Sequence, residues 1–200
     1  MMILVLGGTS WLGDEVARVG LARGHEVTCL ARGESGPAPS SATFVRADRA
    51  EETAHDQVCD RDWDGVVDVS WQPGFVRRAV AALVQRTRTW VYVSSCSVYA
   101  VHDTIGADES ADLLPALQGD EATMAANGEA KVACERAIVD GVGRGRAVTD
   151  AATTAGLVCR PLEQTLADVL HREVTKCLGR DDRAGLSPQE ERHLIAAARS

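Results

Sequence analysis

The chain has 200 residues, 45% of them hydrophobic and 25% charged, a composition that suits one ordinary globular domain with a sizeable core. Its formal net charge of −8 argues against nucleic acid and anionic membranes as partners. The six cysteines form no C-x-x-C pair and do not cluster with histidine, so we expect free, buried thiols in a cytoplasmic protein and no metal site.

A strand, a glycine-rich turn and a helix open the chain. Residues 2–6 are a short apolar run, typical of a strand buried on both faces of a parallel sheet and too short for a membrane span. The stretch "GGTSWLG" follows, and then a helix with a partial apolar stripe of Val16, Val19 and Leu21. The segment "EVTCL" predicts a second strand, which completes a βαβ unit.

The glycine-rich turn of this unit is a candidate nucleotide site. Backbone N–H groups at the start of a helix can face an anion, and glycines let a pyrophosphate approach closely. A tight turn without a ligand would also need glycine, but the strand before it and the helix after it favour the nucleotide. The candidate cofactor-binding residues here are Gly7, Gly8, Thr9, Ser10, Trp11, Leu12 and Gly13.

Strand and helix signals keep alternating to about residue 141. Further strands are expected at 42–47, 64–70 and 89–95, and helices at 74–86 and 120–141. The first of these helices places Val76, Val80 and Leu83 at helical spacing. The alternation predicts an α/β fold, a Rossmann-like, doubly wound parallel sheet of at least five strands, which would form an NAD(P)-binding domain over residues 1–145.

After residue 141 the pattern changes. The stretch "GVGRGRAVTDAATTAG" has no clear period, whereas "RPLEQTLADVLHREV" and "SPQEERHLIAAARS" predict two helices. Ser187 is the expected N-cap of the second, with Pro188 at its first helical position. We therefore expect residues 146–200 to form a helical segment packed on the nucleotide-binding domain.

Three positions at strand ends extend the candidate nucleotide site. The second strand ends at Ala31, where an acid would otherwise bind a ribose 2′-OH, and Arg32 follows. An arginine there can pair with a 2′-phosphate, which favours NADP over NAD, or it is a solvated surface residue. Asp48, after the third strand, could reach an adenine amino group or be a plain loop acid. Ser70, at the end of the fourth strand, is a further cofactor-binding candidate.

Five stretches together resemble the extended or atypical short-chain dehydrogenase/reductase superfamily: "LVLGGTSWLG", "GHEVTCLARG", "WDGVVDVS", "VYVSSCSVYA" and "GEAKVACERAI". Within it they resemble the NAD-dependent epimerase/dehydratase family and its actinobacterial reductase members. The resemblance runs from residue 1 to about 141 and resumes at "AGLVCRPLEQTLADVL" and "AGLSPQEERHLIAAARS". In between, the family has further strands and most of its substrate-binding region, where this chain has about fifteen residues. Either an internal deletion or an incomplete polypeptide explains the difference.

The resemblance implies roles for several residues. In the family's GxxGxxG motif, Gly7 and Gly13 match the first and last glycines, and Ser10 stands at the middle one, where its hydroxyl could still bond a phosphate. Ser95 matches the serine or threonine that bonds the substrate oxygen. In the YxxxK motif the lysine lowers the pKa of the tyrosine and binds the ribose. Lys131 matches that lysine, but Asn127 stands where the tyrosine would be.

The asparagine is the departure with the largest chemical consequence. An amide does not exchange a proton near neutral pH as a phenol beside an ammonium does, and a lost general acid–base costs about 10²–10⁴ in rate. Tyr99, four residues after Ser95, is the one plausible stand-in, although the family uses that position for packing near the cofactor.

Three functions therefore stay open. The preferred one is an NADP-linked oxidoreductase or an epimerase/dehydratase-like enzyme that acts on a small carbonyl or sugar-like substrate, with impaired catalysis. The second is a nucleotide-binding regulatory or redox-sensing module without catalysis, and the third is a truncated remnant. The expected partner is a nicotinamide dinucleotide, NADP with NAD as the alternative. The substrate and a homodimeric state are left open.

Overall fold

The computed structural model describes residues 1–103, 110–143 and 145–148. The two predicted C-terminal helices lie outside these residues. The strands are β1 (Met2–Leu6), β2 (Glu26–Ala31), β3 (Thr43–Arg46), β4 (Trp63–Asp68), β5 (Thr87–Tyr92) and β6 (Ala147–Val148). The α-helices are α1 (Trp11–Ala22), α2 (Pro73–Leu83) and α3 (Asn127–Val142).

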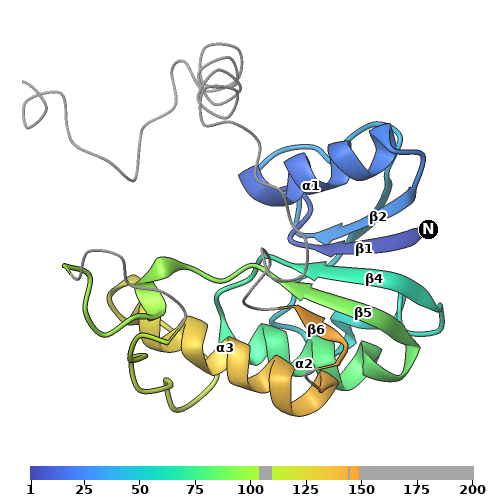
Figure 1. The fold of residues 1–200 in the computed structure, drawn as a ribbon. Helices are drawn as coiled ribbons and strands as arrows, with labels where there is room; N and C mark the ends of the chain where they lie inside the picture. Colours follow the sequence, from blue (N-terminus) through green and yellow to red (C-terminus); the bar gives the residue numbers. More distant parts are fainter. Residues whose placement is uncertain (104–109, 144, 149–200) are drawn as a thin grey trace, which may run out of the picture. The chain divides into compact units, whose positions relative to one another are not determined.

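Within the described residues, six strands form one parallel sheet in the order β3-β2-β1-β4-β5-β6. Helix α1 covers one face of this sheet, and α2 and α3 cover the other (Figure 1). The doubly wound, Rossmann-like α/β fold predicted from the sequence is confirmed. The strand order reverses between β1 and β4, and in such sheets the crevice beyond the carboxyl ends of the strands at this point holds ligands.

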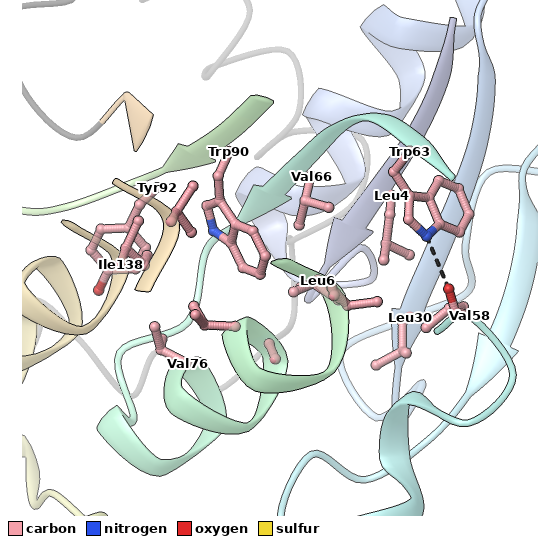
Figure 2. Close-up of a cluster of buried hydrophobic side chains, with 14 of the residues drawn as sticks. Leu4, Leu6, Leu30, Val58, Trp63, Val66, Val76, Trp90, Tyr92 and Ile138 are labelled. Atoms are coloured by element: carbon pink, nitrogen blue, oxygen red, sulfur yellow. Dashed lines mark hydrogen bonds between the residues drawn. The ribbon is translucent and has the colours of Figure 1, made fainter. Parts of the chain in front are cut away.

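The larger core lies between the sheet and helices α2 and α3 (Figure 2). Leu4, Leu6, Val66 and Trp90 are fully buried there. The apolar stripe expected on α2 is confirmed, because Val76, Val80 and Leu83 are all buried. At the edge of this core Trp63 Nε1 donates a hydrogen bond to the Val58 carbonyl at 3.0 Å, so the indole is buried without an orphaned donor.

The expected apolar stripe of α1 is wrong in part. Its buried residues include Gly13, Ala17 and Gly20, whereas Val19 is exposed. These small residues stand about one and two helical turns apart, so they share one face and let the helix approach the sheet closely. The larger apolar residues Val16, Val19 and Leu21 predicted the helix correctly, but the buried face of the helix is the one that carries the small residues and not Val19.

The start of one helix and the presence of one strand also differ from the expectation. The helix expected at 120–141 begins only at Asn127, after a 3-10 turn at Met124–Ala126. The preceding segment is bound to α2 instead: Gln72 exchanges two side-chain hydrogen bonds with the backbone of Ala122, and Gly74 N donates to the carbonyl of Asp120. Strand β6 lies in the stretch that showed no periodicity and pairs with β5.

The thiols in the described part of the chain are free, but they are not all buried. Cys29 and Cys134 are buried, and burial raises the pKa of each thiol to about 11, which makes both unreactive. Cys96 is exposed, contrary to expectation. Among the described helices, none combines the length and apolar character needed to cross a bilayer.

Candidate functional site

The glycine-rich turn joins the end of β1 to the start of α1, and Ser10 closes it. Ser10 Oγ donates to the carbonyl of Gly7 at 2.7 Å and accepts from Gly13 N at 3.2 Å, which makes Ser10 the N-cap of α1. Gly7 has a φ of +93°, a conformation that favours glycine. Ser10, at the position of the family's middle glycine, therefore holds the turn together; a bond from its hydroxyl to a phosphate stays a prediction.

Two further glycines of this turn are required by close packing. A Cβ on Gly13 would overlap the carbonyl oxygen of Gly7 and lie 2.9 Å from the Cα of Gly8. A Cβ on Gly8 would lie 2.6 Å from the Cβ of Cys29, on β2. The turn is thus pressed against both the helix that follows it and the neighbouring strand, and only bare backbone fits.

A cavity of about 220 Å³ opens beside this turn at the carboxyl ends of the central strands. Segments that follow four different strands, together with the first turn of α2, form its wall. The lining residues are Gly7, Thr9 and Ser10 after β1; Leu30, Ala31, Arg32, Gly33, Glu34 and Ser35 at the end of β2; Ala47, Asp48 and Arg49 after β3; Val69, Ser70 and Trp71 after β4; and Phe75 of α2.

Six of the ten predicted cofactor-binding residues line this cavity, and the other four are not among its lining residues. Those that line it are Gly7, Thr9, Ser10, Arg32, Asp48 and Ser70. Gly8 and Gly13 pack against Cys29 and Gly7 within the turn region, and Trp11 and Leu12 are the first residues of α1, with Trp11 52% exposed. The cavity and the turn therefore form one continuous candidate nucleotide site.

Arg32 and Asp48 are both engaged locally. Arg32 is 56% exposed and pairs with Glu34 at 3.1 Å between Nη2 and Oε2. Asp48 Oδ1 accepts from the backbone N–H of Ala50 at 2.9 Å. The Arg32 pair is exposed and contributes little to stability, so Arg32 is available for a competing anion.

Sequence reasoning missed a buried ion pair in the cavity wall. Arg49 donates from both terminal nitrogens to the two carboxylate oxygens of Asp68, each at 2.8 Å. Arg49 is 6% exposed and Asp68 is fully buried at the end of β4. The signal was present: an aspartate that ends the apolar run "GVVD" needs a buried partner, and an arginine next to Asp48 can supply it.

His55 is almost fully buried, and its imidazole is close enough to this ion pair for the charges of Arg49 and Asp68 to act on it. Burial, followed by the charge of Arg49, lowers its pKa from 6.5 to about 4. In the folded chain the imidazole of His55 stays neutral until the pH approaches 4, whereas in the unfolded chain it takes up a proton below pH 6.5. The stability contributed by neutral His55 is therefore fully present above pH 6.5 and is lost as the pH falls towards 4.

We expect His55→Gln to flatten the pH dependence of the unfolding free energy between about pH 4 and 6.5, by an amount on the order of 3 kcal/mol. Denaturant unfolding at a series of pH values measures it. The matched control is His102→Gln, because His102 is exposed. An unchanged slope in His55→Gln would show that His55 titrates normally in the folded protein.

One of the residues expected to be catalytic, Lys131, contacts a residue that lines the cavity. Lys131, on α3, is 7% exposed, and its Nζ donates to the carbonyl of Ser70 at 3.0 Å and of Val93 at 2.6 Å. It also stands 4.7 Å from the ring centroid of Tyr92. Burial lowers the pKa of Lys131. The amine thus bridges the ends of β4 and β5 and, through Ser70, touches the cavity wall.

Ser95 and Asn127 lie on two segments that pack together. Strand β5 ends at Tyr92, earlier than expected, so Ser95 lies in the loop after it, where its Oγ caps the 3-10 turn Cys96–Val98 and lies 3.0 Å from Ser97 Oγ. Asn127 is the half-buried first residue of α3. Its neighbour Gly128 is so close to Ser97 that a Cβ would overlap the Ser97 carbonyl. The start of α3 is therefore fixed against the Ser95 loop.

Comparisons with known proteins agree with this fold. Residues 3–82 match the model of the NAD dependent epimerase/dehydratase family, and no curated protein matches the chain. A UDP-galactose 4-epimerase structure is similar with a TM-score of 0.59 and 20% identity, over 70% of this chain and 51% of that one. The enzyme WbmG of Bordetella bronchiseptica, in complex with NAD, is similar with a TM-score of 0.56 and 16% identity, over 70% of this chain and 50% of that one. The UDP-glucose 4-epimerase of Thermotoga maritima, with UDP-glucose, is similar with a TM-score of 0.58 and 15% identity, over 73% of this chain and 52% of that one.

At these identities the structural likeness shows the fold alone, and the chain spans about half the length of the structures it matches. The sequence match is independent of that likeness and covers β1, the glycine-rich turn and the chain as far as α2. Residues 3–82 are therefore similar in sequence to the NAD dependent epimerase/dehydratase family, and the described residues share the fold of the solved epimerases.

Proposed function

We propose that the chain binds a nicotinamide dinucleotide along the glycine-rich turn and the adjoining cavity, and that it acts weakly as a reductase or epimerase on a small carbonyl or sugar-like substrate. The observation that carries the proposal is the bare-backbone turn at the start of α1, where a Cβ on Gly13 would meet backbone atoms. Such a turn presents N–H groups and the positive end of the helix to a pyrophosphate. The NAD in the WbmG structure is consistent with this ligand class.

A bound nicotinamide supplies or accepts a hydride at its ring. The chain's own residues bind and orient the reactants. Ser95 would donate a hydrogen bond to the substrate oxygen, and Lys131, held by the Ser70 and Val93 carbonyls, would bind the ribose of the cofactor. The amide of Asn127 can hold a water or a substrate oxygen but does not itself pass on a proton. The proposed enzyme is therefore slow.

Within this site we propose a preference for the phosphorylated cofactor. Ala31 leaves the position of the ribose-binding acid without a carboxylate, and Arg32 lines the cavity next to it. Arg46, which is the strand partner of Ala31, lines a neighbouring surface hollow together with Arg32. The two arginines make this edge of the site positive, although Glu34 competes for Arg32.

We expect Arg32→Ala to weaken NADPH binding about ten-fold and to leave NADH binding nearly unchanged, because only the 2′-phosphate uses the guanidinium. Glu34→Gln should strengthen NADPH binding, since it frees Arg32 from its pair. Fluorescence titration with both cofactors measures each effect. Equal weakening of both cofactors in Arg32→Ala would contradict the proposed preference.

A second candidate function is a binding module without catalysis. The observation that favours it is the combination of Asn127 at the start of α3 with a Lys131 amine that already has two carbonyl acceptors. An assay with NADPH and a panel of small aldehydes, ketones and UDP-sugars separates the two functions. Turnover of any member supports the enzyme, and tight cofactor binding with no turnover supports the module.

A further inference from the structure

A series of buried and half-buried hydrogen bonds joins the wall of the cavity to Lys131. Arg49 holds the carboxylate of Asp68 through two bonds of 2.8 Å. Asp68 Oδ1 also accepts from the backbone N–H of Ser70 at 2.9 Å. The carbonyl of that same residue accepts from Lys131 Nζ at 3.0 Å and from the Tyr92 hydroxyl at 2.9 Å. Ser70 is therefore fixed from one side by Asp68 and holds the lysine on the other.

We infer that Asp68 is a positioning residue for Lys131: it orients Ser70 through its N–H, and thereby the carbonyl that anchors the amine, while Arg49 holds Asp68 in place. The inference deepens the proposed function and rests on it for the importance of Lys131. The contacts themselves join only residues of this chain.

The burial of Asp68 makes the position of Ser70 depend on this carboxylate. Asp68 is fully buried and its Oδ1 is the acceptor for the Ser70 N–H, so an apolar side chain in its place removes that acceptor. A peptide that loses such a partner reorients towards another one. The Ser70 N–H and the Ser70 carbonyl belong to adjacent peptide planes that meet at the Ser70 Cα, so a displacement of this Cα would lengthen or break the bond to Lys131 Nζ.

A test must separate two effects of Asp68 on Lys131, its charge and its hold on Ser70, because several other groups also act on the Lys131 amine. Asp68 belongs to β4, Tyr92 to β5, and Cys134 and Glu135 to α3. Removing the carboxylate of Asp68 alone would change the charge near the amine as well as the anchor of Ser70. It would also leave Arg49 buried without its counter-ion, which is strongly destabilising.

Two double variants solve this problem. Arg49→Met with Asp68→Asn, and Arg49→Met with Asp68→Val, both remove one positive and one negative charge. They differ in that the asparagine keeps a carbonyl oxygen for the Ser70 N–H and the valine has none. Replacing a buried ion pair by uncharged residues is often tolerated, so both are expected to fold. Arg49→Met with Asp68→Ala, which is smaller, is the second choice for the form without an acceptor.

Lys131 is unusually easy to observe, since Lys131 and Lys176 are the only lysines of the chain. Acetylation by acetic anhydride, followed by peptide mass spectrometry, gives the reactivity of Lys131 with Lys176 as the reference in the same sample. Lysine side-chain NMR gives a second readout. Both are made on the full chain without cofactor, so they do not depend on activity.

We expect Lys131 in the asparagine form to react as slowly as in the unaltered protein, and about ten-fold faster relative to Lys176 in the valine form, which corresponds to loss of one buried hydrogen bond. Equal Lys131 reactivity in the two forms, both folded by circular dichroism, would overturn the inference. Loss of folding in both the valine and alanine forms, with the asparagine form folded, would also overturn it, because the acceptor would then serve the fold as a whole. A failed NADPH titration with the Lys131 difference intact would refute the cofactor proposal alone.

Discussion

Gly13→Ala is expected to reduce NADPH affinity at least about 100-fold, which is about 2.7 kcal/mol. The added Cβ would overlap the carbonyl of Gly7 and crowd the Cα of Gly8, and neither backbone atom has room to yield. The turn must therefore open, and the N–H groups that face the pyrophosphate move with it. Fluorescence titration of NADPH measures the loss, and a stability decrease of about 1–3 kcal/mol should accompany it.

The matched control for this substitution is Gly65→Ala. Gly65 lies in β4, and a Cβ there meets no atom within 4 Å. Its affinity for NADPH should equal that of the unaltered protein. Undiminished binding in Gly13→Ala, with the chain folded, would remove the glycine-rich turn from the proposed site.

Asn127→Tyr is expected to raise any detectable reductase rate at least ten-fold, at the low end of the 10²–10⁴ that a positioned general acid–base contributes. Asn127 stands one helical turn before Lys131 on α3, so a phenol there would lie on the same side of the helix as the ammonium. The rate of NADPH oxidation with the carbonyl panel measures the gain.

Two controls show whether a proton transfer causes that gain. Asn127→Phe adds the ring without the hydroxyl and should leave the rate unchanged. Asn127→Tyr combined with Lys131→Met should lose most of the gain, because the phenol then lacks the neighbouring ammonium that lowers its pKa. An equal rise in the phenylalanine variant, or no rise in a tyrosine variant that still binds NADPH, would contradict the assignment of "NGEAK" to the YxxxK motif.

The sheet was predictable because its strands are short apolar runs separated by turn residues. The run before Gly7 and the run "VVD" are buried strands as expected. Strand β6 was not predictable, because a two-residue strand has no measurable period and depends on pairing with β5. The late start of α3 depends likewise on tertiary contacts, in which Gln72 and Gly74 bind the segment that the sequence assigned to the helix.

The parts of the candidate site that depend on residues close together in the sequence were predictable. The parts that depend on residues far apart in the sequence were not. The glycine turn and Arg32 could be found from their positions next to strands. Arg49 and Asp68 are 19 residues apart, and their pairing follows from the strand order of the folded sheet. The same is true of Lys131, whose motif predicted a ribose contact but whose two carbonyl partners come from the ends of β4 and β5.

The measurement that tests the central proposal most directly is an NMR titration of the ¹⁵N-labelled chain with NADPH and, separately, with NADH. Binding at the turn predicts saturable shifts concentrated in the backbone signals of residues 7–13, with further shifts at Arg32, Asp48 and Ser70. The Arg32 shift should be larger with NADPH than with NADH. No shift at millimolar cofactor, or shifts confined to residues away from the turn and the cavity, would contradict the account.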